Sequence, residues 1–287
     1  MIKRELGSTG YQIAPVVYGG IISMEDGQDA SDRYVSWAID KGINYFDVAP
    51  SYGDAQEKLG NSIKPFRKDI YLACKTGCRL KKDAQKEFDE SLRLLHTDYF
   101  DNYQMHALST MEDIEQAFGP GGVIELMVHA KEEGIVRKLG ITCHNEDVAL
   151  KALSLYDFDT VLFPLNWGIN MGKDFGSRIS KVAKEKNIGL LGMKTLIHRA
   201  WVNEEERMNS SFTKSWCKPI SGNDELALAA LKYTLSLGSD AVVPPGNFTN
   251  FSFVVEHIDE CLKNPLSADD RKLLEEELVN INEQYFF

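Results

Sequence analysis

The sequence lacks long hydrophobic runs. Its apolar stretches, such as IGLLGM at 188–193, are far too short to span a bilayer. The first ten residues, MIKRELGSTG, include basic side chains but no apolar segment, so we expect no secretory signal there. We therefore predict a cytoplasmic protein without a membrane partner.

Basic residues are in the minority. The chain has 32 Lys and Arg against 43 Asp and Glu, which gives a formal net charge of −11. The basic residues are dispersed, with only short clusters such as RLKK at 79–82. Because a nucleic-acid groove needs a basic face, we expect no nucleic-acid partner.

Cysteine is scarce and odd in number, with five in the chain. Without a secretory signal, reduced thiols are expected. Cys74 and Cys78 are three residues apart, and no second pair follows at the spacing of a zinc site. We interpret both as packing or surface thiols and expect no metal.

Apolar runs of strand length alternate with longer helical patterns. The expected strands are residues 15–20, 43–49, 70–76, 102–107, 136–142, 160–166, 188–194 and 240–246. The expected helices are 31–42, 83–96 with Asp83 as a candidate N-cap, a helix that starts near Val123, 145–156, 174–187, 223–238, 249–263 and 268–283. The longest irregular segment is residues 197–222, and a loop of that length in a compact domain is usually functional or mobile.

This alternation implies parallel strands joined by right-handed crossovers. Eight units in about 250 residues fit an α/β fold of the closed (β/α)8 type, with helix 268–283 beyond the repeat. The alternative is an open doubly wound sheet, which is disfavoured because no G-x-G-x-x-G motif follows the first strand. There is no Pro/Gly/Ser-rich linker, so residues 1–287 are expected to form one domain.

Four ionisable side chains fall at the ends of three consecutive expected strands: Asp47 and Tyr52, Lys75, and His106. In a (β/α)8 barrel the chemistry lies at these carboxyl ends, and neighbouring strands are about 5 Å apart. Taken singly, Asp47 could cap a turn, Tyr52 could be a surface aromatic, and His106 could be a core histidine. Their joint placement predicts a catalytic group.

The chemistry of this group follows from its charges. A buried lysine beside a buried carboxylate stays charged, and that cation is expected to lower the pKa of the Tyr52 phenol from about 10. Tyr52 is then a candidate proton donor to a carbonyl oxygen, which His106 could orient. The group contains no strong nucleophile other than Lys75. A hydride would have to come from a cofactor.

These residues resemble the aldo-keto reductase family. FDVAPSYGDAQEKLG at 46–60 is similar to its D-x-A-x-x-Y-G segment, LACKTG at 72–77 to its lysine strand, and DNYQMHAL at 101–108 to its histidine strand. LGITCHN at 139–145, GMKTL at 192–196 and VVPPGNFTN at 242–250 are similar to its cofactor-contacting segments. LGSTGYQIAPVVYGG at the start looks like its N-terminal β-hairpin and first strand. The likeness covers nearly the whole chain, in order.

The resemblance implies an NAD(P)-dependent oxidoreductase that reduces an aldehyde or ketone on a (β/α)8 barrel. Tyr52 would be the general acid, tuned by Lys75 and Asp47, with His106 orienting the carbonyl. The residues implied in cofactor binding are Gly20 and Asp47 near the nicotinamide, Thr142 and Cys143 at its carboxamide, Met193 on its ring, Lys194, Thr195 and Leu196 at the pyrophosphate, and Gly246, Asn247 and Thr249 at the adenosine phosphate.

The chain departs from the family pattern at the cofactor. Cys143 and Leu162 stand where many members have Asn and Gln. Residues 244–257 contain no Lys or Arg. Many members of the family have a basic side chain in this segment, which contacts the 2′-phosphate of NADPH. That phosphate carries about two negative charges and favours charge-assisted partners. The cofactor is therefore expected to be NADP or NAD, with NAD or dual use consistent with the sequence.

The implied substrate is a small carbonyl compound. Its pocket walls are expected from Ile21, Ile22, Met24, Tyr52, His106, Trp167, the 197–222 segment and Tyr285 to Phe287. Three other functions use the same residues: a Schiff-base lyase with Lys75 as the nucleophile, a non-catalytic nucleotide-sensing subunit, and a redox-neutral epimerase. The sequence indicates no oligomeric state.

Overall fold

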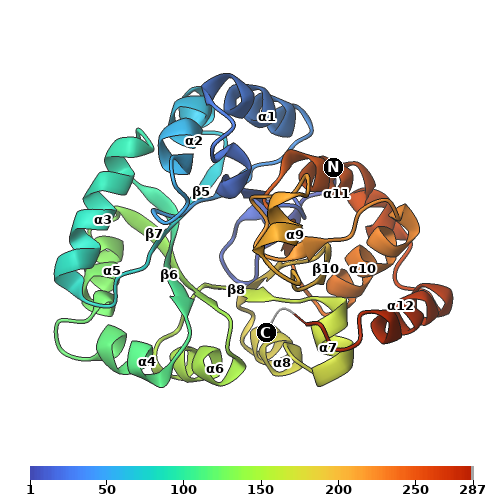
Figure 1. Cartoon of the computed structure of the whole chain (residues 1–287). Coiled ribbons are helices and arrows are strands. Elements are labelled where there is room, and N and C mark those ends of the chain that lie inside the picture. The colour runs from blue at the N-terminus through green and yellow to red at the C-terminus, as the bar shows by residue number, and fades with distance from the viewer. Residues whose placement is uncertain (286–287) are drawn as a thin grey trace.

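Eight parallel strands form the centre of the computed structural model, which describes residues 1–285 (Figure 1). They are β3 (Tyr18–Gly19), β4 (Tyr45–Asp47), β5 (Tyr71–Thr76), β6 (Phe100–Leu108), β7 (Val136–Cys143), β8 (Thr160–Pro164), β9 (Gly189–Met193) and β12 (Ala241–Val243). Neighbours in the sheet follow chain order. The ring closes where Val17 N donates to Val242 O at 2.9 Å and Val242 N donates to Pro15 O at 3.0 Å. The predicted barrel is confirmed, and the open sheet is excluded.

Helices surround the ring. Their bounds are α1 (Gln28–Asp40), α2 (Ala55–Ile63), α3 (Lys81–Leu94), α4 (Met111–Phe118), α5 (Val123–Glu132), α6 (Glu146–Leu155), α7 (Trp167–Lys173), α8 (Ser177–Lys186), α9 (Glu204–Met208), α10 (Asp224–Ser236), α11 (Phe248–Lys263) and α12 (Ala268–Asn280), with 3-10 turns η1 (Gly20–Ser23) and η2 (Lys64–Phe66). As expected, α12 lies beyond the repeat, where it contacts α10 and α7. Within residues 1–285, no helix is both long and apolar enough to cross a membrane.

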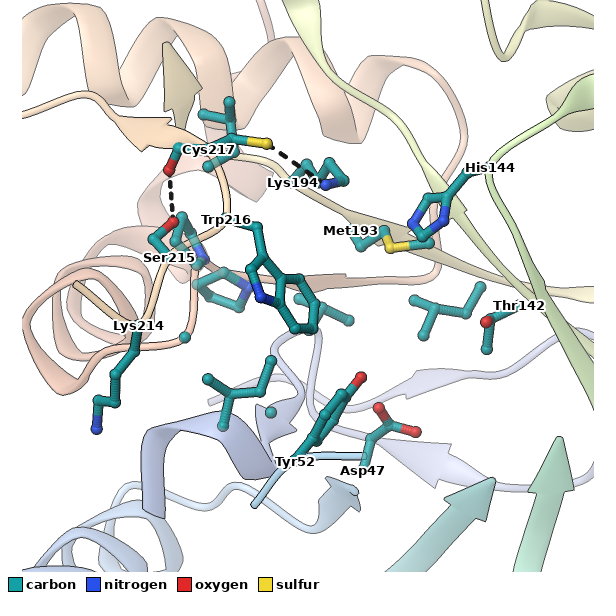
Figure 2. A pocket seen from close by; sticks show the side chains of 18 of the residues that line it. Asp47, Tyr52, Thr142, His144, Met193, Lys194, Lys214, Ser215, Trp216 and Cys217 are labelled. Atoms are coloured by element: carbon teal, nitrogen blue, oxygen red, sulfur yellow. Dashed lines mark hydrogen bonds between the residues drawn. The ribbon is translucent and has the colours of Figure 1, made fainter. Parts of the chain in front are cut away.

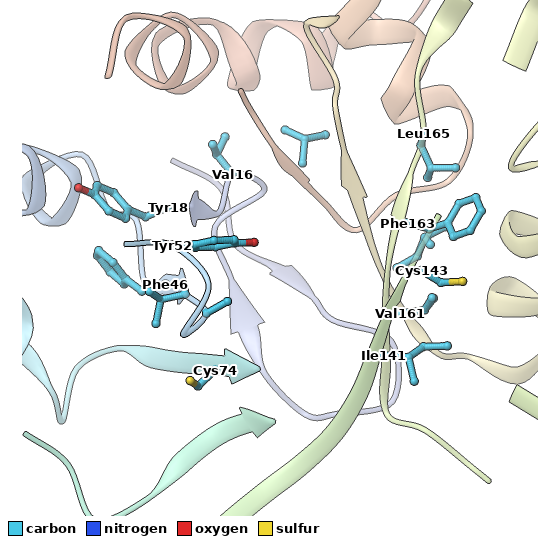
Figure 3. Close-up of a cluster of buried hydrophobic side chains, with 14 of the residues drawn as sticks. Val16, Tyr18, Phe46, Tyr52, Cys74, Ile141, Cys143, Val161, Phe163 and Leu165 are labelled. Carbon is cyan, nitrogen blue, oxygen red and sulfur yellow. The ribbon is translucent and has the colours of Figure 1, made fainter. Parts of the chain in front are cut away.

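Alternation along the strands divides their side chains between two cores. One set packs outward against the helices, and includes Phe46, Ile141 and Phe163 (Figure 3). The other set fills the barrel interior with Tyr45, Ala73, Leu162 and Leu191. Because both faces of each strand are buried, the strands read in the sequence as nearly continuous apolar runs.

A hairpin of β1 (Arg4–Glu5) and β2 (Gln12–Ile13) closes the amino-terminal end of the barrel, as predicted. Leu6 joins the interior core, and Gly7 N donates to Asp240 Oδ2 at 3.1 Å. Gly7 has a φ of +49°, and a Cβ there would lie 2.2 Å from Gly189 N. This glycine is therefore required for the hairpin to sit against β9.

Several local expectations were wrong. Helix α3 begins at Lys81, so Asp83 lies in its first turn and does not cap it. Helices α2, α4 and α7 were not predicted. In α2 the pattern is broken by Gly60, and a Cβ at Gly60 would lie 2.1 Å from Leu94 O, so close packing on α3 demands the glycine. The 197–222 segment contains α9 and a small antiparallel pair, β10 (Ile197–Arg199) and β11 (Lys218–Pro219).

Candidate active site

A cavity opens at the carboxyl ends of the strands (Figure 2). It brings together residues from all eight strands of the barrel and from the 197–222 segment. The predicted residues that line it are Ile21, Asp47, Tyr52, Lys75, His106, Thr142, Met193, Lys194 and Gly246. His144 also lines it and was not predicted. The 197–222 segment was expected at the wall, and it supplies Trp216 and Cys217, which were not singled out as site residues. The four residues of the predicted catalytic group therefore share one cavity.

Lys75 forms an ion pair with Asp47 at the floor of this cavity. The Lys75 side chain is fully buried, and its ammonium donates to Asp47 Oδ2. Burial lowers the pKa of Lys75, but the charge of Asp47 and the contact with Tyr52 outweigh it, so the pKa lies above its ordinary value. Lys75 is therefore a cation at neutral pH.

Gln104 supports Asp47 from the neighbouring strand. Gln104 Nε2 donates to Asp47 Oδ1 at 2.8 Å, and both side chains are buried. Sequence reasoning did not select this residue. The signal was available, because polar residues at 102, 104 and 106 alternate along β6 and so share its inner face.

Tyr52 reaches the same ammonium from the loop after β4. Its hydroxyl lies 3.4 Å from Lys75 Nζ. The turn that returns it to the cavity is closed by Tyr52 N, which donates to Ala49 O at 3.1 Å. The expected decrease in its pKa was wrong: burial raises the pKa of Tyr52 above 10, and Lys75 offsets only part of the effect. Tyr52 therefore keeps its proton at neutral pH, as a general acid must.

Two histidines face the cavity as neutral groups. The rings of His106 and Tyr52 are 5.6 Å apart and nearly perpendicular, at 85°. Burial and the charge of Lys75 lower the pKa of His106 to about 3. Burial and the charge of Lys194 lower the pKa of His144 to about 4. Each ring can therefore donate a hydrogen bond to a substrate oxygen without adding a charge.

The last two residues of strand β7, Thr142 and Cys143, were both predicted to bind the cofactor, but their side chains point to opposite faces of the strand. Thr142 faces the cavity, and its Oγ1 accepts a hydrogen bond from Ala107 N at 2.7 Å. Cys143 faces the helices, where its thiol donates to Leu108 O at 2.8 Å (Figure 3). The structure thus does not place Cys143 at the cavity, because consecutive strand residues point to opposite faces.

Other predicted residues lie outside this cavity. Those that do not line it are Gly20, Ile22, Thr195, Leu196, Asn247, Thr249, Met24, Trp167 and Tyr285, while Phe286 and Phe287 lie outside the described residues. Trp167 is fully buried and its indole donates to Ile197 O at 3.1 Å, so it is a core residue. The aromatic wall is instead Trp216, which is 57% exposed and whose ring lies 6.0 Å from that of Tyr52.

The segment that carries Trp216 crosses the mouth of the cavity, and we name residues 210–220 the strap. Lys214 anchors it to the loop after β3, since its ammonium donates to Ile22 O at 3.0 Å, Met24 O at 2.9 Å and Asp26 Oδ2 at 2.7 Å. On the opposite side, Lys194 Nζ lies 3.6 Å from Cys217 Sγ (Figure 2). The strap thus covers the cavity from the β9 side to the β3 side.

Replacing Lys214 by Met should release the strap. Three hydrogen bonds from one ammonium are lost, so local opening should become at least about tenfold more frequent. Limited proteolysis between residues 200 and 222, followed by mass spectrometry, measures this. Lys218→Met is the matched control, because Lys218 pairs at 2.7 Å with Glu206 inside the same segment. Equal cleavage rates in the two variants would contradict the anchor.

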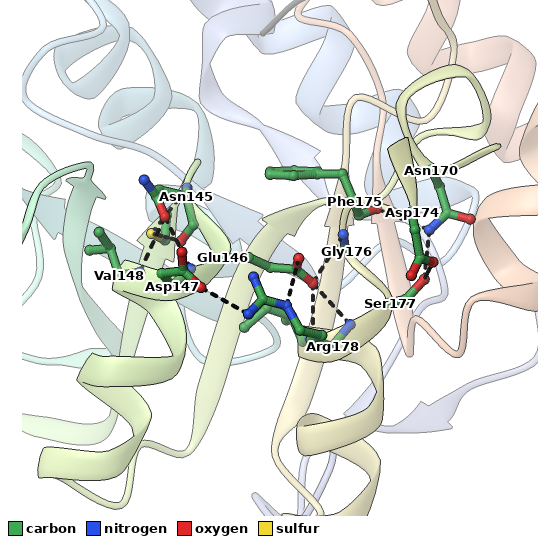
Figure 4. Close-up of polar contacts among 12 residues, drawn as sticks. Asn145, Glu146, Asp147, Val148, Asn170, Asp174, Phe175, Gly176, Ser177 and Arg178 are labelled. Carbon is green, nitrogen blue, oxygen red and sulfur yellow. Dashed lines mark hydrogen bonds and ion pairs between the residues drawn. The ribbon is translucent and has the colours of Figure 1, made fainter. Parts of the chain in front are cut away.

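A separate polar cluster fixes the loop after β7 (Figure 4). The carboxylate of Glu146 accepts from Gly176 N at 3.1 Å, Arg178 N at 2.9 Å and Ile179 N at 3.2 Å. It also pairs with the Arg178 guanidinium at 3.2 Å. Glu146 therefore caps the start of α8, which is a structural role. Across residues 1–285, no group of three or more His, Cys, Asp or Glu could hold a metal ion.

Comparison with known sequences finds one family. A model of the aldo/keto reductase family matches residues 20–246. Uncharacterized oxidoreductase YqkF of Bacillus subtilis is 32% identical over 156 residues, which cover 50% of this chain and 49% of that protein. L-galactose dehydrogenase of Arabidopsis thaliana is 29% identical over 58% of this chain and 57% of its own length. 6-Dehydroglucose reductase of Novosphingobium aromaticivorans is 29% identical over 50% and 52%. The matches thus span about half the length of these relatives.

Solved structures share the fold. The holo form of aldo-keto reductase AKR11C1 from Bacillus halodurans aligns with a TM-score of 0.72 and 22% identity, over 96% of each chain. An aldo/keto reductase from Brucella melitensis aligns with a TM-score of 0.66 and 16% identity, over 96% of this chain and all of that one. At these identities the likeness establishes the barrel alone.

Proposed function

Because the chain belongs to the aldo/keto reductase family, we propose that it reduces an aldehyde or ketone to an alcohol, with hydride from a nicotinamide dinucleotide. One observation carries the proposal. In a single buried cluster, the Lys75 ammonium contacts both the Asp47 carboxylate and the Tyr52 hydroxyl. This arrangement supports proton donation to a developing alkoxide.

The residues present fit such a cofactor. Thr142, Met193 and Lys194 line the catalytic cavity, and Gly246 brings backbone close to it. The side-chain amides of Asn247 and Asn250 are buried and have no hydrogen-bond partner in the described part of the chain. These residues would hold the dinucleotide, which when bound supplies a hydride to the carbonyl carbon.

The protein's own groups would handle the proton and the carbonyl oxygen. The Tyr52 hydroxyl donates its proton to that oxygen, and the adjacent Lys75 cation stabilises the phenolate that is left. Asp47 keeps Lys75 charged and fixes its position, and Gln104 holds Asp47. The neutral ring of His106 can donate a second hydrogen bond to the carbonyl oxygen.

We propose a small, uncharged carbonyl compound as the substrate. Ile21, Leu162 and Trp216 provide apolar walls, while His106 and His144 provide neutral polar groups. No arginine is among the described residues that line the cavity, so a carboxylate substrate would lack a bidentate partner. Two relatives carry names that refer to sugars, L-galactose dehydrogenase and 6-dehydroglucose reductase, which supports hydroxylated carbonyls as the first compounds to test. The cytoplasmic location stays a prediction from the sequence.

A Schiff-base lyase is disfavoured by the state of Lys75. Its nucleophile would have to be a neutral amine, whereas the pKa of Lys75 is raised by Asp47 and Tyr52. The ammonium is also held by the ion pair at the cavity floor. Protonation and position both favour Lys75 as an electrostatic partner of Tyr52.

Transfer of a label tests the proposal. The protein is mixed with NADH or NADPH deuterated at either face of nicotinamide C4, together with a panel of aldehydes and ketones. We expect one deuterium on the carbinol carbon of the alcohol from only one of the two C4-labelled forms, and no Lys75 adduct on borohydride trapping. A Lys75 adduct would favour the lyase, and cofactor binding without turnover on the whole panel would favour a sensing subunit. Either result would overturn the reductase.

A further inference from the structure

The interior of the barrel contains a second layer of polar side chains beneath the catalytic group. Asn102 on β6 donates through its Nδ2 to Tyr45 OH at 2.9 Å and to Thr160 Oγ1 at 2.8 Å. Tyr45 lies two residues before Asp47 on β4. Asn102 likewise lies two residues before Gln104 on β6. Because side chains two positions apart share one face of a strand, this layer lies directly below Asp47 and Gln104.

The hydrogen bonds of this layer are incomplete. Asn102 Oδ1 and Gln104 Oε1 are buried carbonyl oxygens that accept no hydrogen bond from residues 1–285. The hydroxyls of Tyr45 and Thr160 accept from Asn102, and neither donates its own hydrogen to another of these residues. All four side chains are at most 1% exposed, so bulk solvent does not reach them. Since a buried polar group without a partner is costly, two acceptors and two donors point to a ligand.

Gly140 brings the upper and the lower residues of this region together. It pairs in register with Gln104 on one side and with Thr160 on the other. A Cβ at Gly140 would lie 2.2 Å from Thr160 Oγ1 and 3.1 Å from Gln104 Cγ, so these two side chains approach each other over the glycine. Gln104 Oε1 nevertheless does not bond to Thr160. One water molecule can join polar atoms about 5 Å apart, since each of its hydrogen bonds is about 2.8 Å long.

We propose that the barrel interior binds one structural water molecule between Gln104 and Asn102. Its two hydrogens are donated to Gln104 Oε1 and Asn102 Oδ1, and its oxygen accepts from the hydroxyls of Tyr45 and Thr160. Buried water molecules typically make about three such bonds, and this site offers two acceptors and two donors. A metal cation would satisfy the carbonyl oxygens but would leave both hydroxyl hydrogens without acceptors.

The water gives Asn102 a role in orienting the catalytic group. An amide has a donor end and an acceptor end, and Gln104 presents its donor end, Nε2, to Asp47 Oδ1 at 2.8 Å. A water that donates to Gln104 Oε1 fixes the amide in this direction. With the amide reversed, its oxygen would face the Asp47 carboxylate and repel it. Asn102 is thus a positioning residue that acts on Asp47 through the water and Gln104. This role rests on the proposed function, whereas the water site does not.

Crystallography tests the water site directly. A high-resolution crystal structure of the wild-type protein should show one ordered water within about 3.2 Å of both Gln104 Oε1 and Asn102 Oδ1. The structure of Asn102→Leu should lack it. A wild-type interior without this water would overturn the proposal, as would amides of Asn102 and Gln104 that bond directly to each other. Either result would leave the reductase intact.

Steady-state kinetics test the role of Asn102. Asn102→Leu should lower kcat by about three- to tenfold, the effect of one lost hydrogen bond, with the substrate KM and the cofactor affinity within about twofold of wild type. Asn170→Leu is the matched control. Asn170 is also a buried amide, and it donates to Phe175 O and to Ser177 Oγ, both at 3.0 Å, outside the cavity. This control should be destabilised in urea and keep the kcat of wild type.

A gentler variant keeps the test decisive if Asn102→Leu does not fold. Thr160→Val retains the shape of the side chain and removes one hydroxyl, so it should show the same split, with kcat lowered by about two- to threefold and KM unchanged. A kcat equal to that of Asn170→Leu would overturn the positioning role. A wild-type protein that contains the water but reduces no carbonyl compound would overturn the proposed function and leave the water site standing.

Discussion

Replacing Tyr52 by Phe should lower kcat for carbonyl reduction by about 10²- to 10⁴-fold, the usual contribution of a positioned general acid. Phe keeps the ring that packs against His106 and Trp216, and it removes only the hydroxyl beside Lys75. Cofactor affinity should therefore change little. Steady-state kinetics with NADH measure the loss, and fluorescence quenching measures the binding.

Tyr103→Phe is the matched control for this variant. Tyr103 is a buried tyrosine on the helical side of β6, outside the cavity, so removal of its hydroxyl should leave kcat within about twofold of wild type. A Tyr52→Phe enzyme that stays within tenfold of wild type would remove Tyr52 from the mechanism.

The pKa values of Tyr52 and His106 predict how the rate of reduction by the wild-type enzyme depends on pH. An acid catalyst is active below its own pKa, and burial raises the pKa of Tyr52 above 10. The pKa of His106 is lowered to about 3, so its ring stays neutral above pH 5. The rate of reduction should therefore be flat from about pH 6 to 9. A decline that begins near pH 7 would mean that the bound cofactor lowers the pKa of Tyr52 far below the value set by the protein.

Replacing Asp47 by Asn should destabilise the fold by about 3–5 kcal/mol, because it leaves a buried ammonium without its counter-ion. Lys75 is fully buried and Asp47 is only 3% exposed, so water cannot replace the lost charge. Urea unfolding followed by circular dichroism gives the free energy. Lys75→Met should also destabilise, since it leaves the Asp47 carboxylate with Gln104 as its remaining side-chain partner at 2.8 Å.

The double variant Asp47→Asn/Lys75→Met separates charge from packing. It removes both ions and retains side chains of similar size, so it should regain most of the stability lost in Asp47→Asn. The double variant should still be inactive, because Tyr52 would have no cation beside it. If the two single changes simply add, the pair contributes no coupling and the buried ion pair is not the source of the effect.

The barrel could be predicted because its strands are buried on both faces. Runs such as 70–76 and 160–166 lie within one or two residues of β5 and β8. Helix α2 was missed because Gly60 interrupts its helical pattern. The glycine is needed because α2 packs closely against α3 at this position. Local sequence does not contain such a contact.

The site residues that lie at the ends of strands could be predicted from the sequence. Asp47, Lys75, His106 and Thr142 are positioned by the sheet, and the alternation of β7 could also have separated Thr142 from Cys143. The choice between Trp167 and Trp216 was not accessible, because Trp216 is placed by Lys214, which bonds to a loop about 190 positions earlier. To predict whether the pKa of Tyr52 is raised or lowered, the burial of its side chain must be weighed against the charge of Lys75, and the sequence does not give that burial.

Closure of the ring through Val242 has a consequence for how the protein is made. All four residues of the catalytic group have been synthesised once residue 106 is added, yet the segment that leads into β3 has no partner on its open side until Val242 pairs with Pro15 and Val17. Until then the growing chain exposes an unpaired strand edge and an interior without its last wall, which is the kind of surface that chaperones bind. The site is therefore completed only after residue 242 is made, although its catalytic group is encoded in the first 106 residues.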